Sequence, residues 1–203
     1  MTLALIDYGA GNLHSVHNAL KAAGAADVRV TADPDILAHA DRIVLPGVGA
    51  FAHCMAALSV IDGMIAAMEQ RVRVQGIPFL GICVGMQLLA DEGVEHKRTR
   101  GLGWIPGTVR AIAPATDLKI PHMGWNDVVP SGNAPLVERG EAYFLHGYHF
   151  DAADATDVLA TTDHGGVLVA AVGRANIIGV QFHPEKSQAY GINFLKRFLE
   201  WKP

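Results

Sequence analysis

Apolar and polar positions follow two patterns along the first half of the chain. Short uninterrupted apolar runs are typical of buried strands, and they alternate with segments in which apolar residues recur every three or four positions, as on one face of a helix. The helical spacing is clearest at Leu13, Val16 and Leu20, and Gly24 ends that segment. The pattern predicts strands at 3–6, 28–30, 42–45 and 79–82, and helices at 13–23, from 34, at 51–58 and at 85–90.

Beyond Gly101 short strands follow one another without intervening helices. The polar, basic segment 91–100 before this point is expected to be a solvated loop. Residues 173–176 are typical of a hairpin connection, and Ser187 is placed to cap a final helix through Phe194 and Phe198. The predicted strands of this half are 108–112, 125–129, 143–145, 157–161, 167–172 and 177–182.

Together these patterns indicate an α/β protein. Strands that alternate with helices predict a largely parallel sheet covered by helices on both faces. The second half is expected to be antiparallel and to extend or flank that sheet. Repeats, low-complexity segments and linkers are absent from the sequence, so residues 1–203 are expected to form a single domain. In such folds, function collects beyond the carboxyl ends of the parallel strands.

Composition limits the possible partners and the cellular compartment of the protein. Half of the residues are hydrophobic, 18% are charged and the formal net charge is −4, which argues against a nucleic-acid partner held by phosphate contacts. The two cysteines, Cys54 and Cys83, fit a reducing compartment. Asp7 comes too early for a signal peptide, and no apolar stretch approaches the ~18 residues of a membrane span. We therefore expect a cytoplasmic protein with no membrane partner.

The most informative stretch surrounds Cys83. An apolar strand meets a cysteine with glycines two positions before and after it, Gly81 and Gly85, which is the pattern of a nucleophile elbow. A cysteine at the start of a helix is favoured as thiolate, and the N–H of Val84 is placed to hold an oxyanion. Gln87 lies one helical turn further and would face the same pocket. The alternative is that Cys83 is a small buried hydrophobe.

A second loop carries glycines directly after a strand. In Pro46-Gly47-Val48-Gly49-Ala50-Phe51, both glycines let the backbone approach a ligand and present N–H groups. An ordinary tight turn is the alternative, but acyl chemistry at an elbow requires a second oxyanion donor. Residues 9–11 lack the third glycine of a dinucleotide fingerprint, and no cofactor is expected.

The strand at 177–182 leads into His183-Pro184-Glu185, which supplies a candidate base. Pro184 biases His183 toward extended backbone, where residues two apart point to the same side, so that Glu185 can accept the far N–H of the imidazole. The alternative is a helix N-terminus with an exposed acid. A metal site formed by His146, His149, His183 and Glu185 has suitable ligand types, but it leaves the elbow unexplained.

These two segments, 81–87 and 182–185, resemble the signatures of class I glutamine amidotransferases. The stretches 7–13, 46–51, 121–126 and 182–187 are more specifically similar to the members of that family that serve a cyclase in histidine biosynthesis. The resemblance runs from the first strand to the last helix. It implies a three-layer sandwich, in which a mixed, mostly parallel sheet lies between helices.

The resemblance also implies roles. Cys83 would attack the glutamine carboxamide, His183 would protonate the departing amine and later activate water, and Glu185 would orient His183. Ammonia would pass to a partner cyclase, a (β/α)8 barrel, in a heterodimer, without metal or cofactor. Gly49 and Val84 would supply oxyanion N–H groups, Gly47, Gln87, Gly147 and Tyr148 would bind glutamine, and the interface would hold Asn12, Pro121, His122, Met123, Trp125, Asn126 and Lys186.

Other functions remain open on the sequence alone. A glutaminase for another acceptor, such as one in pyridoxal phosphate synthesis, would share the triad but should lack the 121–126 stretch. A non-catalytic binding subunit would have no reason to retain Cys83, His183 and Glu185 together. A cysteine peptidase would use the same triad on peptide bonds.

Overall fold

The computed structural model describes residues 1–113, 118–132 and 134–203, and two β-sheets organise this part of the chain. In the larger sheet, the first five strands run parallel and the remaining four continue it antiparallel. The expectation of a mixed sheet is confirmed, with its parallel pairs confined to one half. The spatial order is β2 (Asp27–Thr31), β1 (Thr2–Ile6), β3 (Arg42–Gly47), β4 (Phe79–Cys83), β13 (Ile177–Val180), β12 (Val167–Arg174), β11 (Val158–Asp163), β8 (His122–Pro130) and β9 (Gly140–His146).

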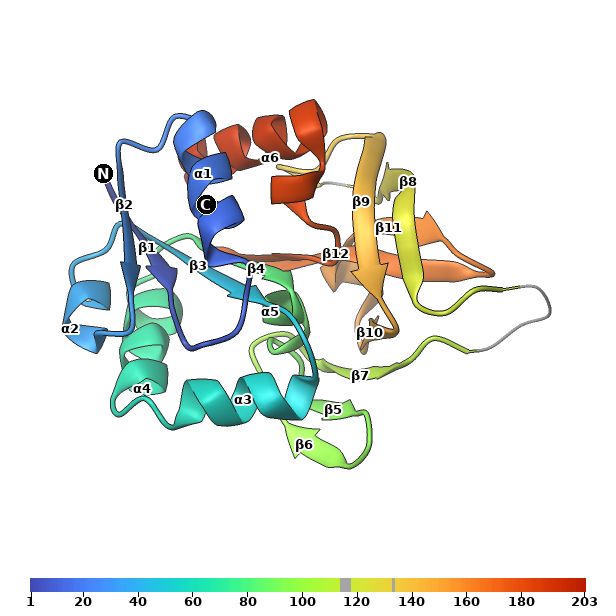
Figure 1. The fold of residues 1–203 in the computed structure, drawn as a ribbon, viewed down its shortest axis with the longest axis horizontal. Helices are drawn as coiled ribbons and strands as arrows, with labels where there is room; N and C mark the ends of the chain where they lie inside the picture. Colours follow the sequence, from blue (N-terminus) through green and yellow to red (C-terminus); the bar gives the residue numbers. More distant parts are fainter. Residues whose placement is uncertain (114–117, 133) are drawn as a thin grey trace.

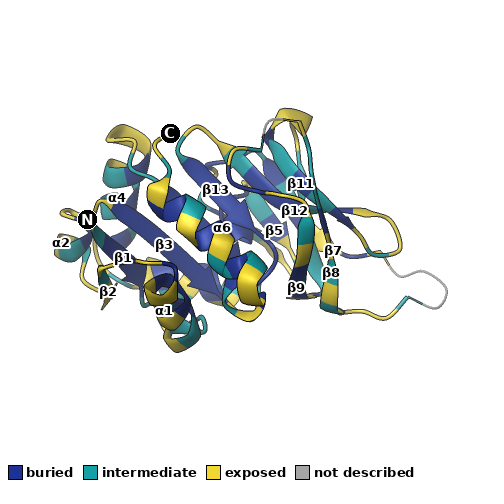
Figure 2. Ribbon diagram, turned by 90° about the horizontal axis from the view of Figure 1, so that it is seen from above, coloured by how far each residue is buried: buried dark blue, intermediate teal, exposed yellow. Residues whose placement is uncertain are grey.

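Helices cover both faces of the parallel half, which confirms the three-layer arrangement (Figure 1). One face carries α1 (Leu13–Ala22) and α6 (Gln188–Glu200), and the other carries α3 (Phe51–Ser59), α4 (Met64–Met68) and α5 (Val84–Gln87). The strands between them are dark with burial in Figure 2, whereas the helices are exposed on their outer sides. Shorter elements are α2 (Pro34–Leu37), the π-helix η1 (Glu69–Val74) and the 3-10 turns η2 (Ala155–Asp157) and η3 (Pro184–Lys186).

Continuous apolar runs correctly predicted the buried strands. Every residue of β3, β4 and β13 is buried, as a strand with helices on both faces requires. No single helix in the described residues is long and apolar enough to span a membrane. The helices Phe51–Ser59 and Met64–Val74 pass that test of length and composition only as a pair, bent by 93° at their junction.

The smaller sheet corrects one prediction. It consists of β10 (Tyr148–Ala152), β7 (Gly107–Ala111), β5 (Glu92–Val94) and β6 (Arg98–Arg100), so the segment expected to be a solvated loop contains two strands. β5 pairs parallel with β7, and Gly93 lies so close to the Phe51 ring that a Cβ there would be 2.6 Å from it. Long-range pairing stabilises these short polar strands, and no local apolar pattern announces them.

Ser187 also departs from its predicted role. It occupies the N-cap position of α6, but its hydroxyl makes no cap hydrogen bond. Instead Oγ donates to the His183 carbonyl (2.7 Å) and accepts from the Tyr143 N–H (2.9 Å). The residue is fully buried, so its two partners replace the water that it loses.

Candidate active site

Cys83 ends β4 in a strained backbone conformation, with φ 54° and ψ −111°. Positive φ is costly for a residue with a side chain and is retained where the surrounding structure enforces it. The flanking glycines provide the room: a Cβ on Gly85 would lie 1.9 Å from the Leu45 carbonyl oxygen, and one on Gly81 would lie 2.5 Å from that of Gly85. The predicted elbow is therefore present, and sterics explain its glycines.

The helix after the elbow is shorter than predicted. α5 comprises only the 4 residues Val84–Gln87, where a helix to residue 90 was expected. A single turn sums few peptide dipoles, so it favours a thiolate less than a full helix would. Val84 and Gln87, the first and last residues of α5, both line the cavity beside Cys83.

His183 and Glu185 form a buried hydrogen-bonded pair. Nδ1 of His183 lies 2.9 Å from Oε1 of Glu185, and the two side chains are 3% and 2% exposed. The pairing was predicted, but its geometry was not: His183 is extended, whereas Glu185 lies in the 3-10 turn η3 that Pro184 begins. Burial opposes the charge on His183, yet interactions with Cys83 and Glu185 outweigh it and raise the pKa of His183 to about 10.

The backbone around His183 is anchored from two other elements. The His183 N–H donates to the Tyr143 carbonyl of β9 (2.9 Å), and its carbonyl accepts from the Ser187 hydroxyl. Gly191 of α6 lies against the turn, since a Cβ there would be 1.9 Å from the Pro184 oxygen. β9 and α6 thus fix the position of the imidazole relative to Cys83.

A cavity of about 150 Å³ joins these residues. Cys83 and His183 line it together, while Glu185 lies behind His183. Gly47 does not line the cavity: a Cβ there would lie 2.7 Å from both the Gly85 nitrogen and the Tyr8 hydroxyl, so this glycine serves close packing under the elbow. Other predicted residues that line the cavity are Gly49, Val84, Gln87, Gly147, Tyr148 and Lys186.

Two polar residues at the site were missed by the sequence reasoning. Gln181 is fully buried and its Nε2 lies 3.6 Å from the Cys83 sulfur. An amide in an otherwise apolar strand was the signal available for it. Glu95 lines the cavity and its Oε2 accepts the Phe51 N–H (2.9 Å), but it lies in a polar segment where nothing distinguishes it.

Three of the predicted interface residues, Met123, Trp125 and Lys186, lie on one face beside the cavity. Met123 and Trp125 of β8 are 63% and 47% exposed, and Met123 pairs with the exposed Leu145 of β9. The Trp125 ring contacts Tyr143 edge-on (6.2 Å between centroids), and Lys186 Nζ lies 5.7 Å over that Tyr143 ring. Lys186 lines the cavity, so this apolar face extends to its mouth. Asn12 is the N-cap residue of α1, and α1 packs against η3. Pro121 is exposed.

His122 lies beneath that face. It is 3% exposed, and its Nδ1 lies 3.0 Å from Nε2 of His146. Asn126 Nδ2 is 3.0 Å from the other ring nitrogen of His122, and His146 Nδ1 lies 2.9 Å from the Tyr148 carbonyl. Burial lowers the pKa of His122 to about 4 and that of His146 to about 3, so both rings are neutral links of this chain.

These contacts leave the metal alternative without support. Both ring nitrogens of His146 are engaged in hydrogen bonds, and Nδ1 of His183 is engaged with Glu185. Across the residues that the structure describes, no group of three or more His, Cys, Asp or Glu side chains is arranged to hold a metal ion.

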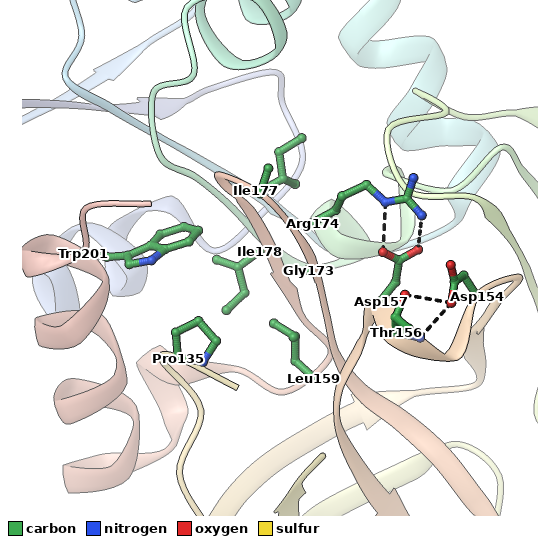
Figure 3. Close-up of a pocket in the computed structure, with 11 residues that line it drawn as sticks. Pro135, Asp154, Thr156, Asp157, Leu159, Gly173, Arg174, Ile177, Ile178 and Trp201 are labelled. Atoms are coloured by element: carbon green, nitrogen blue, oxygen red, sulfur yellow. Dashed lines mark hydrogen bonds and ion pairs between the residues drawn. The ribbon is translucent and has the colours of Figure 1, made fainter. Parts of the chain in front are cut away.

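A larger cavity of about 560 Å³ is lined by Ile177, at the start of β13 (Figure 3). It therefore lies near the amino ends of the parallel strands, opposite the carboxyl end where Cys83 lies. Arg174 and Asp157 form a two-point ion pair there, with N–O distances of 2.9 and 2.7 Å. None of the described residues that line it was predicted to act in catalysis, and its apolar wall contains Trp201. Size alone therefore does not locate the active site.

Comparison with known proteins agrees with this geometry. Residues 4–201 match the glutamine amidotransferase class-I family, and the chain belongs to it. It is thus a glutamine amidotransferase by family, with an elbow cysteine in a cavity that fits that class.

Within the family, the chain is similar over its full length to imidazole glycerol phosphate synthase subunit HisH. The protein of that name from Zymomonas mobilis is 59% identical over 206 residues, with 100% of this chain and 97% of the relative covered. The one from Rhodospirillum rubrum is 54% identical over 214 residues, with both chains fully covered.

Solved structures share the fold at lower identity. A glutamine amidotransferase superimposes with a TM-score of 0.78 at 20% identity, over 98% of each chain. PurLQS from Thermotoga maritima gives a TM-score of 0.71 at 20% identity, over 98% of this chain and 95% of that one. At this identity these two structures support the fold alone.

Proposed function

We propose that the chain is the glutaminase subunit of imidazole glycerol phosphate synthase, which hydrolyses glutamine to glutamate and ammonia. The observation that carries the proposal is the strained elbow cysteine, Cys83, in one cavity with the His183–Glu185 pair. The full-length similarity to HisH subunits supports the choice of this branch of the family.

The proposed chemistry proceeds in two steps at Cys83. The sulfur attacks the carboxamide carbon, and the N–H groups of Gly49 and Val84 receive the charge that develops on the oxygen. The carbon–nitrogen bond then breaks as His183 transfers a proton to the nitrogen, so ammonia leaves and a thioester remains. In the second step His183 takes a proton from water, the hydroxide attacks the thioester, and glutamate is released with the thiolate restored.

The cavity favours a small amino acid over a peptide. Its volume of about 150 Å³ suits a single side chain. Glu95 places a carboxylate at the wall, which would attract the ammonium group of a free amino acid. Gln87, Gly147 and Tyr148 would contact the remaining polar groups of glutamine, as the resemblance implies.

The partner is proposed to cover the exposed apolar face of Met123, Trp125 and Leu145. Exposed apolar side chains that gather on one face are typical of protein–protein contacts. Because this face reaches the cavity through Tyr143 and Lys186, a partner on it would lie next to the ammonia that is formed. We propose a cyclase with a (β/α)8 barrel, in a heterodimer.

The test is glutamate release from glutamine by the purified chain, alone and mixed with the cyclase and its ribonucleotide acceptor. We expect hydrolysis that Cys83→Ala abolishes and a cyclised product that depends on glutamine. Hydrolysis of peptides without turnover of glutamine would support a peptidase instead, and binding without any hydrolysis would support a non-catalytic subunit. Synthesis with a different acceptor alone would indicate another glutaminase branch.

A further inference from the structure

Gln181 carries a polar amide at a fully buried position directly after β13, where an apolar side chain would be usual. Its backbone N–H donates to the Ala170 carbonyl of β12 (2.8 Å). The parallel register pairs Val180 with Ile82, so the next residues, Gln181 and Cys83, lie side by side. An unpaired amide there would be costly, and its partners therefore explain its presence.

The orientation of the Gln181 amide is fixed by a chain of hydrogen bonds. The Tyr148 carbonyl can only accept, so the group 3.1 Å from it on Gln87 is the donor Nε2. The same nitrogen lies 2.9 Å from Gln181, whose side-chain oxygen must therefore face Gln87. The Gln181 NH₂ group is left on the opposite side, where the Cys83 sulfur lies at 3.6 Å.

A fixed N–H donor acts differently on the two forms of the sulfur. The hydrogen bond from the donor becomes stronger when the sulfur is a thiolate, because its acceptor is then charged. The donor therefore favours the thiolate over the thiol. The Leu145 carbonyl, 3.9 Å from the sulfur, can accept only from the neutral thiol. Because α5 is a single turn, the titratable groups around the sulfur come from other elements. His183 and Glu95 line the same cavity, and Tyr8 and Cys54 also lie close enough to interact with Cys83 electrostatically.

We propose that Gln181, aimed by Gln87, is a hydrogen-bond donor that holds the Cys83 sulfur as thiolate and fixes its direction of attack. The proposal rests on the proposed function only in taking Cys83 as the nucleophile. It adds to the triad a residue that touches the reacting atom.

The test is the pH dependence of alkylation of Cys83 by iodoacetamide in the full chain, with mass spectrometry separating Cys83 from Cys54. Gln181→Met keeps the length of the side chain and removes the donor. Loss of a hydrogen bond to a charged group should move the midpoint of the alkylation rate against pH upward by about one pH unit. At pH values below that midpoint, the thiolate population should fall about tenfold. Gln87→Met should move it less, in the same direction.

The controls separate this role from packing. Gln181→Asn keeps an amide that is too short to reach the sulfur, so it should behave like Gln181→Met. Thr162→Val removes a buried polar group, a hydroxyl, elsewhere in the same sheet and should leave the midpoint unchanged. Thermal unfolding and thiolate absorbance are measured on every variant to show which variants fold. If Gln181→Met does not fold, the alkylation midpoint of Gln181→Asn tests the proposal instead.

An unchanged midpoint in a folded Gln181 variant overturns the proposal, even if its Tm falls, because a structural role alone predicts that result. An unchanged midpoint in Gln87→Met overturns the part assigned to Gln87. Alkylation needs no glutamine, so this test is independent of the test of the proposed function. Glutamine hydrolysis that survives Cys83→Ala would refute the proposed function.

Discussion

Replacing Glu185 by glutamine removes one charge from the buried His183–Glu185 pair while keeping its size. The pair is nearly fully buried at 2.9 Å, so solvent does little to screen it. A hydrogen bond to a charged group contributes ~1.5–3 kcal/mol, and 1.36 kcal/mol corresponds to tenfold in rate, which predicts a loss in kcat of roughly 10- to 100-fold. The glutamine amide can also donate to Nδ1 and hold the wrong tautomer.

The same change should alter the pH profile. Burial lowers the pKa of His183, while Cys83 and Glu185 together raise it to about 10. A neutral residue at 185 takes away one of these two contributions, so the pKa of His183 falls. The imidazolium that protonates the departing ammonia is then lost at a lower pH, and the alkaline limb of glutaminase activity should move downward.

The assay is steady-state glutamate release with cyclase and acceptor present, measured between the ordinary histidine pKa of 6.5 and about 10. His183→Ala should lose more activity, since it removes the base itself. Glu138→Gln is the matched control, because its carboxylate is 68% exposed and pairs with Arg197 on the surface. Unchanged kcat and an unmoved alkaline limb in Glu185→Gln would refute the assigned role of Glu185.

Three further changes test other links of the structure. Cys83→Ala should abolish glutamine-dependent synthesis and leave ammonia-dependent synthesis by the partner intact, as product assays with either nitrogen source would reveal; equal losses would contradict a two-site mechanism. Gly85→Ala forces a Cβ to 1.9 Å from the Leu45 oxygen and should prevent folding or lower Tm strongly, whereas Gly147→Ala, whose nearest contact is 3.8 Å, should fold normally by circular dichroism. The isolated chain should be a poor glutaminase that the cyclase with acceptor activates, and Trp125→Ala should weaken that activation; equal kcat alone, with cyclase and with both would argue against coupling.

Local sterics explain what could be predicted about the site. The glycines around Cys83 are required by backbone contacts within a few ångströms, so their spacing in the sequence already specified the elbow. The His183–Glu185 pair could be predicted because both residues belong to one short segment. Its 3-10 geometry could not, since extended and turned backbones both bring the two side chains together.

By itself, the sequence determined the buried strands and the α/β class, and it singled out Cys83, His183 and Glu185 as candidate site residues, because apolar runs, glycine spacing and short-range geometry are local properties. Only the tertiary structure decided that Gln181 lies beside the Cys83 sulfur, that His122 lies under the apolar face and that segment 91–100 joins a second sheet. These features depend on strand order and register between residues far apart in the chain. A shift of register would change each of them without altering any local pattern.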